Sequence, residues 1–316
     1  MSAVPAAATV LSRPGDTLAA MGRLTVVALI AGLMLASCAS IDDDTRSGVT
    51  STVLPSPSVV TSTSAGPTPT TSTTTTVPEP TPIGTAPEAA EFTVVASHPH
   101  DDDAFTQGLL FWADRFVEST GPRGESDLRV VDPDTGEVLE SQPLDDRFWG
   151  EGLARVDDRL VQLTWEAGTA FVWDLSTLEL ETTFTYNGEG WGLCHDGGRL
   201  VMSNGSSFLT FRDPDTFAVT GSIEVTWAGS PIGSLNELEC IDGRVWANVW
   251  KDTRILIIDP TTGAVSHVLD ASELVPTVPE PQTDVLNGIA HDPATGRIWV
   301  TGKDWPVLYE LDVELP

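Results

Sequence analysis

From Phe92 to the C-terminus, apolar and polar residues alternate in short runs that are separated by Asp, Gly and Pro. Typical runs are RLVQLTW at 159–165 and RVWANVW at 244–250. Alternation with a period of two residues is that of a β-strand with one buried face. No stretch keeps a helical period over a useful length, so this part of the chain is predicted to be all-β.

An apolar run that ends in an aspartate turn occurs repeatedly in this region. The copies are VVDPDTGEV at 130–138, VWDLSTLEL at 172–180, FRDPDTFAV at 211–219, IIDPTTGAV at 257–265 and a truncated YELDVEL at 309–315. The aspartates of the first four copies, Asp132, Asp174, Asp213 and Asp259, are 42, 39 and 46 residues apart. Asp-Pro-x-Thr-Gly is hairpin chemistry, because proline presets φ, aspartate bonds its own backbone and glycine accepts a positive φ.

A second motif precedes these turns. Its copies contain, at matching places, Gln107, Glu151, Trp191, Glu237 and Asn287. These residues are 44, 40, 46 and 50 positions apart, so the region holds five copies of one unit. Periods of this length in an all-β sequence are those of propeller blades, whereas a β-sandwich would not produce register-matched copies. We therefore predict a five-bladed β-propeller over residues 91–316.

The N-terminal segment carries the pattern of an export signal. Residues 21–38, MGRLTVVALIAGLMLASC, place one arginine before an apolar run that is too short to span a bilayer. The ending Leu-Ala-Ser-Cys resembles a bacterial lipobox, so residues 1–38 are predicted to be a signal peptide with lipid attachment at Cys38. A plain secretory signal is the alternative, and translation would start at Met1 or Met21. We expect an extracytoplasmic protein that touches the membrane only through this anchor, or a secreted one.

Residues 39–90 form a Ser/Thr/Pro-rich tract with almost no large apolar side chains. Such a tract cannot bury enough surface to fold, and it is predicted to be a disordered linker. The formal net charge is -30, from 46 acidic and 16 basic residues. This balance argues against a nucleic-acid partner, because phosphate binding needs the opposite sign. We expect a monomer.

Two further features of the sequence could indicate a disulfide or a metal site. Cys194 and Cys240 could pair in an oxidising compartment, but two cysteines without a framework spacing do not predict a disulfide. The run HPHDDDA at 98–104 offers two histidines and three aspartates. Adjacent side chains of an extended segment point to opposite faces, so these cannot all bind one ion. No metal and no other cofactor is predicted.

Equivalent positions of propeller blades form rings around a common axis. The ring at the start of the first strands contains Gln107, Glu151, Trp191, Asn236-Glu237 and Asn287. The ring at the end of the second strands contains Glu118, Trp165, Asn204, Trp250 and Lys303. A purely structural ring would repeat one residue type, whereas this mixture of carboxylates, amides, indoles and a lysine suits a binding site. For each tryptophan, packing between blades is the alternative.

Seven stretches carry a family resemblance: PHDDDAFTQGLLF, ESTGPRGESDLRVVDPDTGEV, GEGLARVDDRLVQLTW, EGWGLCHDG, LNELECIDGRVWANVW, LNGIAHD and TGKDWPVLYE. In this order they resemble the motifs of the plant and bacterial type glutaminyl-peptide cyclotransferases, or glutamine cyclotransferases. The resemblance runs from about Phe92 to the C-terminus. It implies a five-bladed propeller that cyclises the N-terminal glutamine of peptides or proteins to pyroglutamate, with release of ammonia and without zinc.

The resemblance also implies roles in catalysis. Glu151, in the Gly-Glu-Gly motif, would accept and return a proton, because the α-amine attacks the side-chain amide and ammonia must leave. Glu118 would hold the substrate's ammonium group. Lys303 and the amide of Asn236 would stabilise the developing oxyanion.

Other residues would bind the substrate. Gln107 would position the substrate amide, and Asn287 is a further substrate-binding candidate. The indoles of Trp165, Trp191 and Trp250 would form the pocket walls and exclude water. Trp191 lies between two glycines, which we attribute to a tight backbone bend at the channel mouth.

Two positions depart from the family pattern, and two other functions remain open. Asn204 stands where Asp is usual, so a carboxylate is missing there, and Trp149 stands where Phe is usual, which should alter packing or pocket width. One alternative is a non-enzymatic lipoprotein propeller that binds peptide ends, which would not need Glu151 together with Lys303. The other is a metal-dependent lactonase-like propeller, which would need four convergent oxygen ligands where this chain has indoles.

Overall fold

The computed structural model describes residues 79–276 and 285–316. The regular structure in these residues is β-strand, apart from one short 3-10 helix, η1 (Ser272–Leu274). The all-β prediction is therefore confirmed. Within the same residues, no helix has the length and apolar character that a membrane span requires. The predicted signal peptide, the lipid attachment residue Cys38 and most of the predicted linker lie outside the described residues.

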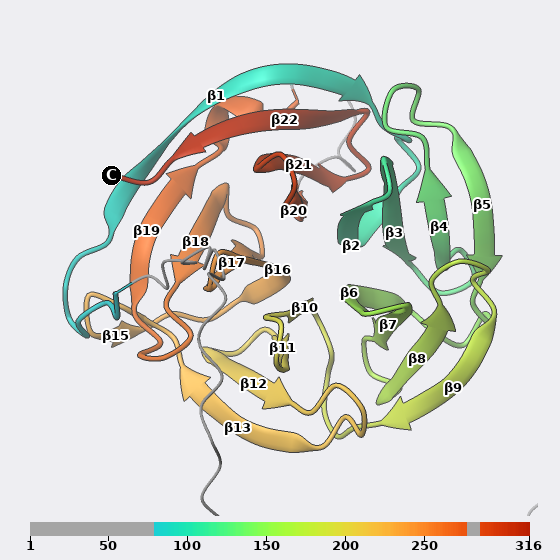
Figure 1. Ribbon diagram of the computed structural model, residues 1–316, viewed down its shortest axis with the longest axis horizontal. Coiled ribbons are helices and arrows are strands. Elements are labelled where there is room, and N and C mark those ends of the chain that lie inside the picture. Colours follow the sequence, from blue (N-terminus) through green and yellow to red (C-terminus); the bar gives the residue numbers. More distant parts are fainter. Residues whose placement is uncertain (1–78, 277–284) are drawn as a thin grey trace, which may run out of the picture. The chain divides into compact units, whose positions relative to one another are not determined.

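Most strands belong to antiparallel groups of four that follow the order of the chain (Figure 1). The first group is β2 (Phe105–Trp112), β3 (Arg115–Gly121), β4 (Asp127–Val131) and β5 (Val138–Pro143). The second is β6 (Gly150–Val156), β7 (Arg159–Thr164), β8 (Thr169–Asp174) and β9 (Leu180–Thr185). The third is β10 (Leu193–His195), β11 (Leu200–Met202), β12 (Phe208–Arg212) and β13 (Val219–Glu224).

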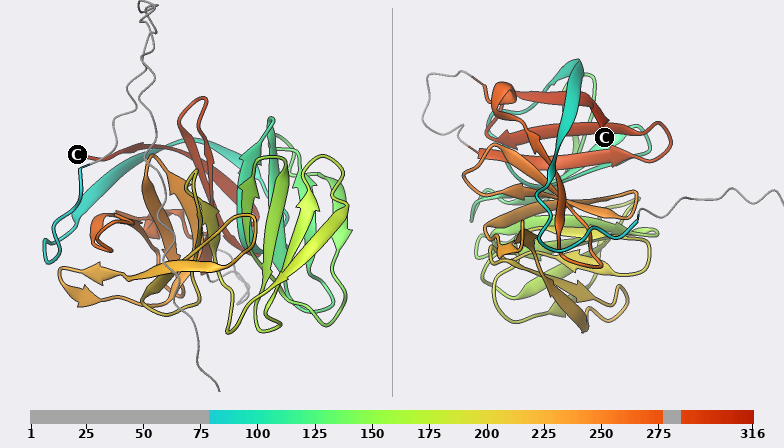
Figure 2. Two further views of the ribbon diagram at one scale, coloured as in Figure 1. Left: turned by 60° about the horizontal axis from the view of Figure 1, so that its bottom comes forward. Right: turned by 90° about the vertical axis from the view of Figure 1, so that its left-hand side faces the viewer.

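The remaining strands form one eight-stranded sheet and a small hairpin. One half of the sheet is β16 (Leu235–Ile241), β17 (Arg244–Val249), β18 (Arg254–Ile258) and β19 (Val265–Asp270). The other half is β20 (Val285–Asp292), β21 (Arg297–Lys303), β22 (Val307–Glu314) and β1 (Glu88–Pro99). β1 pairs antiparallel with β22, and the two strands run side by side in Figure 2. β1 also pairs with β19, which joins the halves. The hairpin is β14 (Thr226–Trp227) and β15 (Ser230–Pro231).

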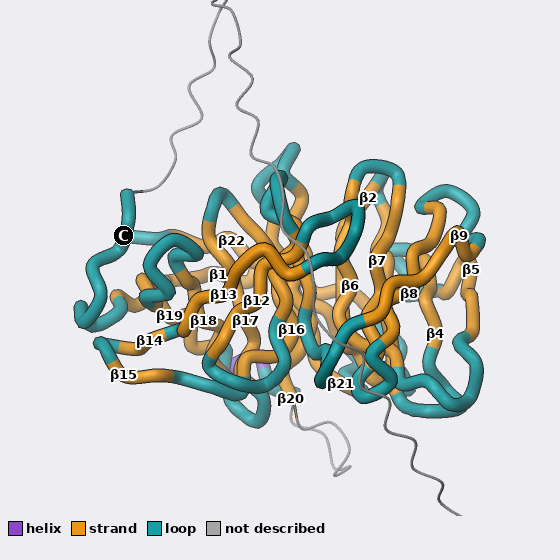
Figure 3. The backbone as a smooth tube through the Cα atoms, turned by 90° about the horizontal axis from the view of Figure 1, so that it is seen from below, coloured by secondary structure: helices purple, strands orange, loops and turns teal. Residues whose placement is uncertain are grey.

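The first strands of the groups surround a common centre (Figure 1). Contacts connect β2 to β6, β6 to β10, β10 to β16, β16 to β20, and β20 back to β2. The hydrophobic core is divided in the same way, since each of its clusters lies between two neighbouring groups. For example, Leu110 and Leu128 of the first group pack with Leu153 and Phe171 of the second. Loops lie at the ends of the strands (Figure 3), where they can carry functional side chains.

The aspartate turns form as predicted. Asp132 Oδ1 accepts a hydrogen bond from the backbone N–H of Thr135 at 2.9 Å, and Gly136 has a φ of 71°. In the next two copies Leu178 and Phe217 take the place of the glycine, with φ of 51° and 59°. Both side chains are buried in the core, so their packing offsets the cost of the left-handed backbone.

Residues 79–90, which fall in the predicted linker, contact the folded strands. The backbone N–H of Thr81 donates to Asp259 Oδ2 at 2.6 Å, and Arg244 donates to the carbonyl of Glu79 at 2.8 Å. β1 itself begins at Glu88, before the predicted boundary at residue 91. The segment that precedes β1 is thereby attached to β17 and to the turn after β18.

Cys194 and Cys240 form a disulfide between β10 and β16, with their Cα atoms 5.5 Å apart. The sequence does not predict this pair, because its spacing matches no framework. The reason for the pair is spatial, since β10 and β16 are neighbours around the common centre. The disulfide therefore links two successive groups of strands near that centre.

Candidate active site

Four of the residues predicted for the site lie in β-bulges of the first strands. The pairing register shifts between Thr106 and Gly108 in β2, Gly150 and Leu153 in β6, Leu235 and Leu238 in β16, and Leu286 and Ile289 in β20. Gln107, Glu151, Asn236 and Asn287 fall within these shifts. A bulge re-aims a side chain out of the regular alternation of a strand. The repeated bulge is thus the local structure that sets these positions apart.

Glycine follows the site residue in most of these strands, and the reason is close packing. A Cβ atom at Gly152 would lie 2.5 Å from the backbone nitrogen of Leu193, and one at Gly192 would lie 2.1 Å from the carbonyl oxygen of Asn236. Gly192 does not have a positive φ. Close approach of the next strand, and not the expected backbone bend, therefore explains why glycine adjoins Trp191.

A cavity of about 280 Å³ brings most of the predicted residues together. It is lined by Phe105, Gln107, Trp149, Glu151, Trp165, Trp191, Asn236, Trp250 and Lys303. Sequence reasoning assigned seven of these to the site and did not assign Phe105 or Trp149. Phe105 precedes Gln107 by two residues, and Trp149 precedes Glu151 by two. This matching offset in two copies of the repeat is the signal that could have found both.

Edge-to-face contacts join the aromatic rings of this cavity. The ring centroids are 5.7 Å apart for Phe105 and Trp149, 5.5 Å for Trp149 and Trp165, and 5.7 Å for Trp191 and Trp250. The interplanar angles of these pairs are 86°, 65° and 82°. T-shaped pairs stabilise by about 0.5–1.5 kcal/mol beyond their area burial. These five rings, called the aromatic wall below, therefore pack as joined units.

Glu189 connects two indoles of the aromatic wall, and sequence reasoning missed it. Its Oε2 accepts hydrogen bonds from Nε1 of Trp165 and Nε1 of Trp191, both at 2.9 Å. Glu189 is exposed and lies in the loop between β9 and β10. It precedes Trp191 by two residues, as Phe105 precedes Gln107 and Trp149 precedes Glu151, so the position recurs but a carboxylate at this position does not.

Glu151 is the buried carboxyl group of the cavity, with 4% of its surface exposed. Gln107 Nε2 donates a hydrogen bond to Glu151 Oε1 at 2.8 Å. Burial raises the pKa of Glu151 well above its ordinary value of 4.5, against the opposing charge of Lys303, and the charge of Glu189 raises this pKa further. The protonated form of Glu151 is thereby accessible at pH values where an ordinary glutamate is charged.

Two further polar residues line the cavity. Asn236 is 2% exposed, and its Nδ2 has no hydrogen-bond partner among the residues that the structure describes. Lys303 is buried, with Nζ 4.6 Å from the centroid of the Phe105 ring. Asn204, at the position that departs from the family pattern, is exposed and does not line the cavity, and its Oδ1 accepts a hydrogen bond from Ser206 Oγ at 2.6 Å.

Asn287 does not line the cavity, although direct contact with the substrate was predicted. Its Nδ2 donates to the carbonyl oxygen of Thr106 at 2.9 Å and lies 3.4 Å from Gln107 Oε1. Gln107 in turn donates to Glu151. The bulge that turns Asn287 inward therefore aims it at Gln107, which it orients from behind the cavity.

Glu118 also does not line the cavity, so it is not placed for the predicted contact with the substrate's ammonium group. Its Oε1 accepts a hydrogen bond from Thr106 Oγ1 at 2.6 Å and lies 3.1 Å from His100 Nε2. Its Oε2 accepts a hydrogen bond from Arg129 Nε at 2.9 Å. Burial opposes the charged form, but Arg129 and His100 outweigh burial and lower the pKa of Glu118 to about 2. Glu118 is thus a paired carboxylate of the scaffold.

His100 and Asp101 complete this buried group, called the Glu118 cluster below. Nδ1 of His100 lies 2.7 Å from the carbonyl oxygen of Trp305, so both ring nitrogens face oxygen acceptors. Burial opposes the imidazolium, yet Glu118 raises the pKa of His100. Arg129 also pairs with Asp101 Oδ2 at 2.8 Å. Opposite charges are therefore matched inside the cluster.

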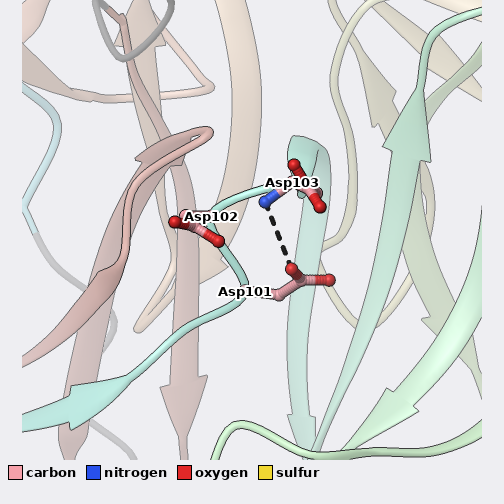
Figure 4. A group of neighbouring side chains, drawn as sticks. All are labelled: Asp101, Asp102 and Asp103. Atoms are coloured by element: carbon pink, nitrogen blue, oxygen red, sulfur yellow. Dashed lines mark hydrogen bonds between the residues drawn. The ribbon is translucent and has the colours of Figure 1, made fainter. Parts of the chain in front are cut away.

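Asp101, Asp102 and Asp103 lie closer together than an extended segment would allow. One carboxylate oxygen of each lies within 4.8 Å of the others. The chain turns here, and the backbone N–H of Asp103 donates to Asp101 Oδ1 at 3.1 Å (Figure 4). The expectation that these side chains diverge is therefore wrong. Asp101 is already paired with Arg129 and the other two aspartates are exposed, so we assign no metal to this turn.

Comparisons with known proteins identify the family of this chain. Residues 63–313 match the family described as glutamine cyclotransferase. The chain is 42% identical over 229 residues to an Arabidopsis thaliana protein named glutaminyl-peptide cyclotransferase, which covers 71% of this chain and 72% of that protein. It is 41% identical to the crystal structure of Myxococcus xanthus glutaminyl cyclase, with a TM-score of 0.69 over 73% of this chain and 99% of that one. The family match spans most of the chain, and both relatives are more than 40% identical to it. The chain therefore belongs to the glutamine cyclotransferase family.

Proposed function

We propose that this enzyme cyclises the N-terminal glutamine of peptides or proteins to pyroglutamate and releases ammonia. The observation that carries the proposal is the buried Glu151 carboxyl, which accepts a hydrogen bond from Gln107 inside a cavity of about 280 Å³. A cavity of this size suits the end of a peptide better than a large ligand. The names of the Arabidopsis and Myxococcus relatives support the same activity and argue against a non-catalytic binding module.

The reaction moves one proton between two nitrogens. The α-amino nitrogen of the substrate attacks the side-chain amide carbon, the five-membered ring closes, and the bond from that carbon to the amide nitrogen breaks. Glu151, as a carboxylate, accepts a proton from the attacking nitrogen. It then returns that proton to the departing nitrogen, which leaves as ammonia. The raised pKa of Glu151 supports this role, because both of its forms must be reached in each turnover.

Other residues of the cavity suit the charge and shape of the transition state. The amide oxygen becomes negative as the tetrahedral intermediate forms. Asn236 Nδ2 is an unused buried donor, and Lys303 supplies a positive charge near Glu151. The aromatic wall excludes water and restricts a flexible glutamine side chain to conformations close to ring closure.

We further infer that the fold is a five-bladed β-propeller with the active site at its centre. The closed circuit of β2, β6, β10, β16 and β20 supports this inference, as do the core clusters between successive groups. Each group of four strands is then one blade, and β1 completes the last blade beside β22. Such a ring lets bulges of one kind in four of the first strands, β2, β6, β16 and β20, bring their side chains toward one centre.

We propose an extracytoplasmic location, with a lipid at Cys38 as the membrane anchor. The disulfide between Cys194 and Cys240 supports an oxidising compartment, because disulfides are rare in reducing cytosol. Labelling of a bacterial host with a radioactive fatty acid should mark the wild-type chain and not a Cys38→Ser variant. Equal labelling of both chains would contradict the anchor.

Ammonia release from a glutaminyl dipeptide by the purified full chain tests the proposed reaction. We expect release by the wild type and a loss of kcat of about 10²- to 10⁴-fold in Glu151→Gln, which keeps the shape of the side chain but cannot carry a proton. Glu166→Gln, at an exposed position next to Trp165, is the matched control and should keep the wild-type rate. A folded wild-type chain that releases no ammonia from any glutaminyl peptide would contradict the proposal.

A further inference from the structure

The aromatic wall consists of two sets of touching rings, one that ends at Trp165 and one that ends at Trp191. Ring contacts within the described residues do not join these two indoles. A single atom, Glu189 Oε2, accepts the N–H of both at 2.9 Å. The carboxylate of Glu189 therefore connects the two sets of rings, which do not touch each other through these indoles.

We propose that Glu189 is the positioning residue of this cavity: one carboxylate oxygen holds the two sets of rings at the separation that fits a glutamine side chain, and its charge acts on Glu151. The inference rests on the proposed cyclisation of N-terminal glutamine and names the residue that prepares the site for it. Glu189 does not itself line the cavity, so it acts through Trp165 and Trp191.

The backbone on the C-terminal side of Glu189 is held firmly enough for this role. The N–H of Gly190 donates to the carbonyl oxygen of Trp165 at 2.9 Å, and the N–H of Trp191 donates to that of Ser203 at 3.1 Å. A Cβ atom at residue 190 would lie 2.4 Å from the hydroxyl oxygen of Tyr186, so the loop is packed tightly. An exposed glutamate on a loose loop would lose much of its benefit to side-chain entropy. Glu189 is exposed, but the two residues that follow it are fixed to the backbone of Trp165 and Ser203.

The charge of Glu189 also reaches the proton carrier. The charged groups that act on Glu151 are Lys303 from β21 and Glu189 from the loop, and Glu151 in turn acts on the Tyr186 hydroxyl at the end of the second group. Burial raises the pKa of Tyr186 to about 12, so this hydroxyl stays neutral in the working range. Lys303 and Glu189 thus act in opposite directions on Glu151. Removal of the Glu189 charge should lower the pKa of Glu151.

Two variants separate geometry from charge. Glu189→Ala removes the acceptor of both indole N–H groups. The value of kcat/KM for a glutaminyl dipeptide should then fall about 10- to 100-fold, because Trp165 and Trp191 are no longer held at a fixed separation. Glu189→Gln keeps an acceptor oxygen without the charge. Its kcat/KM at the optimal pH should stay within about threefold of wild type, and the acidic limb of its pH profile should move to lower pH. Glu166→Ala, which removes an exposed glutamate that pairs with Arg123, is the control and should change neither quantity.

Each outcome decides the matter. A Glu189→Ala enzyme with wild-type kcat/KM would overturn the proposal, and so would a Glu189→Gln enzyme whose acidic limb does not move. If the alanine variant unfolds, as judged by circular dichroism, the pH profile of the glutamine variant decides alone. A wild-type chain without activity would reject the proposed reaction itself, whereas an active Glu189→Ala beside an inactive Glu151→Gln would reject only the role of Glu189.

Discussion

Two buried glutamates of this chain have opposite surroundings. Glu118 and Glu151 are 1% and 4% exposed, and burial penalises the charged form of each. Glu118 is paired with Arg129 and His100, which lower its pKa to about 2. Glu151 accepts a hydrogen bond from the neutral amide of Gln107, and its pKa is raised well above 4.5. Burial is common to both, so the partners decide the direction.

Of these two buried carboxylates, Glu151 is the one whose pKa allows it to take up a proton. Glu118 is held charged by its cations, and it binds Thr106, whose neighbour Gln107 lines the cavity. Its place is in the scaffold behind the site. Glu151 faces the cavity and can reach its protonated form, which suits a group that accepts and returns a proton.

The largest expected effect separates the two residues by stability. Glu118→Gln leaves His100 without its carboxylate and leaves Arg129 with Asp101 alone, and breaking a buried ion pair costs about 3–5 kcal/mol. Urea unfolding near neutral pH should show a loss of free energy of unfolding of this size. Glu151→Gln, measured beside it, should show no loss. A Glu118→Gln chain as stable as the wild type would contradict the scaffold role.

The pH dependence of stability should have opposite signs at the two sites. Glu118 has a folded pKa of about 2, below its ordinary value of 4.5, so its contribution is present above pH 4.5 and is lost as the pH falls toward 2. The shift corresponds to about 3 kcal/mol. Glu151 has a raised pKa, so the folded state loses stability as the pH rises above 4.5.

Melting temperatures of both glutamine variants across acidic and neutral pH test these signs. Relative to wild type, Glu151→Gln should gain stability as the pH rises, and Glu118→Gln should be least harmful at the lowest pH. Parallel curves for the two variants would show that their carboxyl groups do not differ in the way described.

The next largest effect is a change in kcat at nearly constant folding stability. Asn236→Ala removes a buried donor that has no partner among the described residues, so the folded state loses little. If that donor stabilises the oxyanion, kcat for ammonia release should fall about 10²-fold with KM nearly unchanged. A raised KM with wild-type kcat would instead assign Asn236 to ground-state binding of the substrate.

The smallest expected effect is that of a chelator. Glu151 is the one carboxylate among the cavity-lining residues, and no histidine is among them. Ammonia release should therefore be the same before and after treatment with EDTA. Activity that disappears with EDTA and returns with a divalent metal would contradict the metal-free mechanism.

Much of the site could be predicted because repeated local structure produces it. The bulge with a following glycine recurs in β2, β6 and β20, and it marked Gln107, Glu151 and Asn287 as equivalent. The aspartate turns at matching spacings gave the all-β organisation in the same way. Local chemistry that recurs at a fixed period is visible in sequence because each copy supports the assignment of the others.

The remaining features depend on contacts between segments far apart in sequence. Asn287 lies in the same kind of bulge as Gln107, but its side chain contacts Gln107 and does not line the cavity. Glu118 is paired with Arg129 of the next strand instead of facing the cavity. The other copies of the repeat have no arginine at the position of Arg129, so the repeat gives no sign of this pair. Glu189 lies in a loop, and only this copy of the repeat has a carboxylate at that position. The disulfide joins residues of two different copies. Such differences between copies are settled by packing and not by the repeat itself.

The most direct test of the account is an infrared pH titration of the protonated carboxyl absorption, recorded as wild type minus Glu151→Gln. The account predicts a protonated carboxyl band from Glu151 that persists well above pH 4.5, and no such band in the matching difference for Glu118→Gln. A Glu151 band that disappears at or below pH 4.5 would contradict the claim that burial keeps this carboxyl group ready to carry a proton.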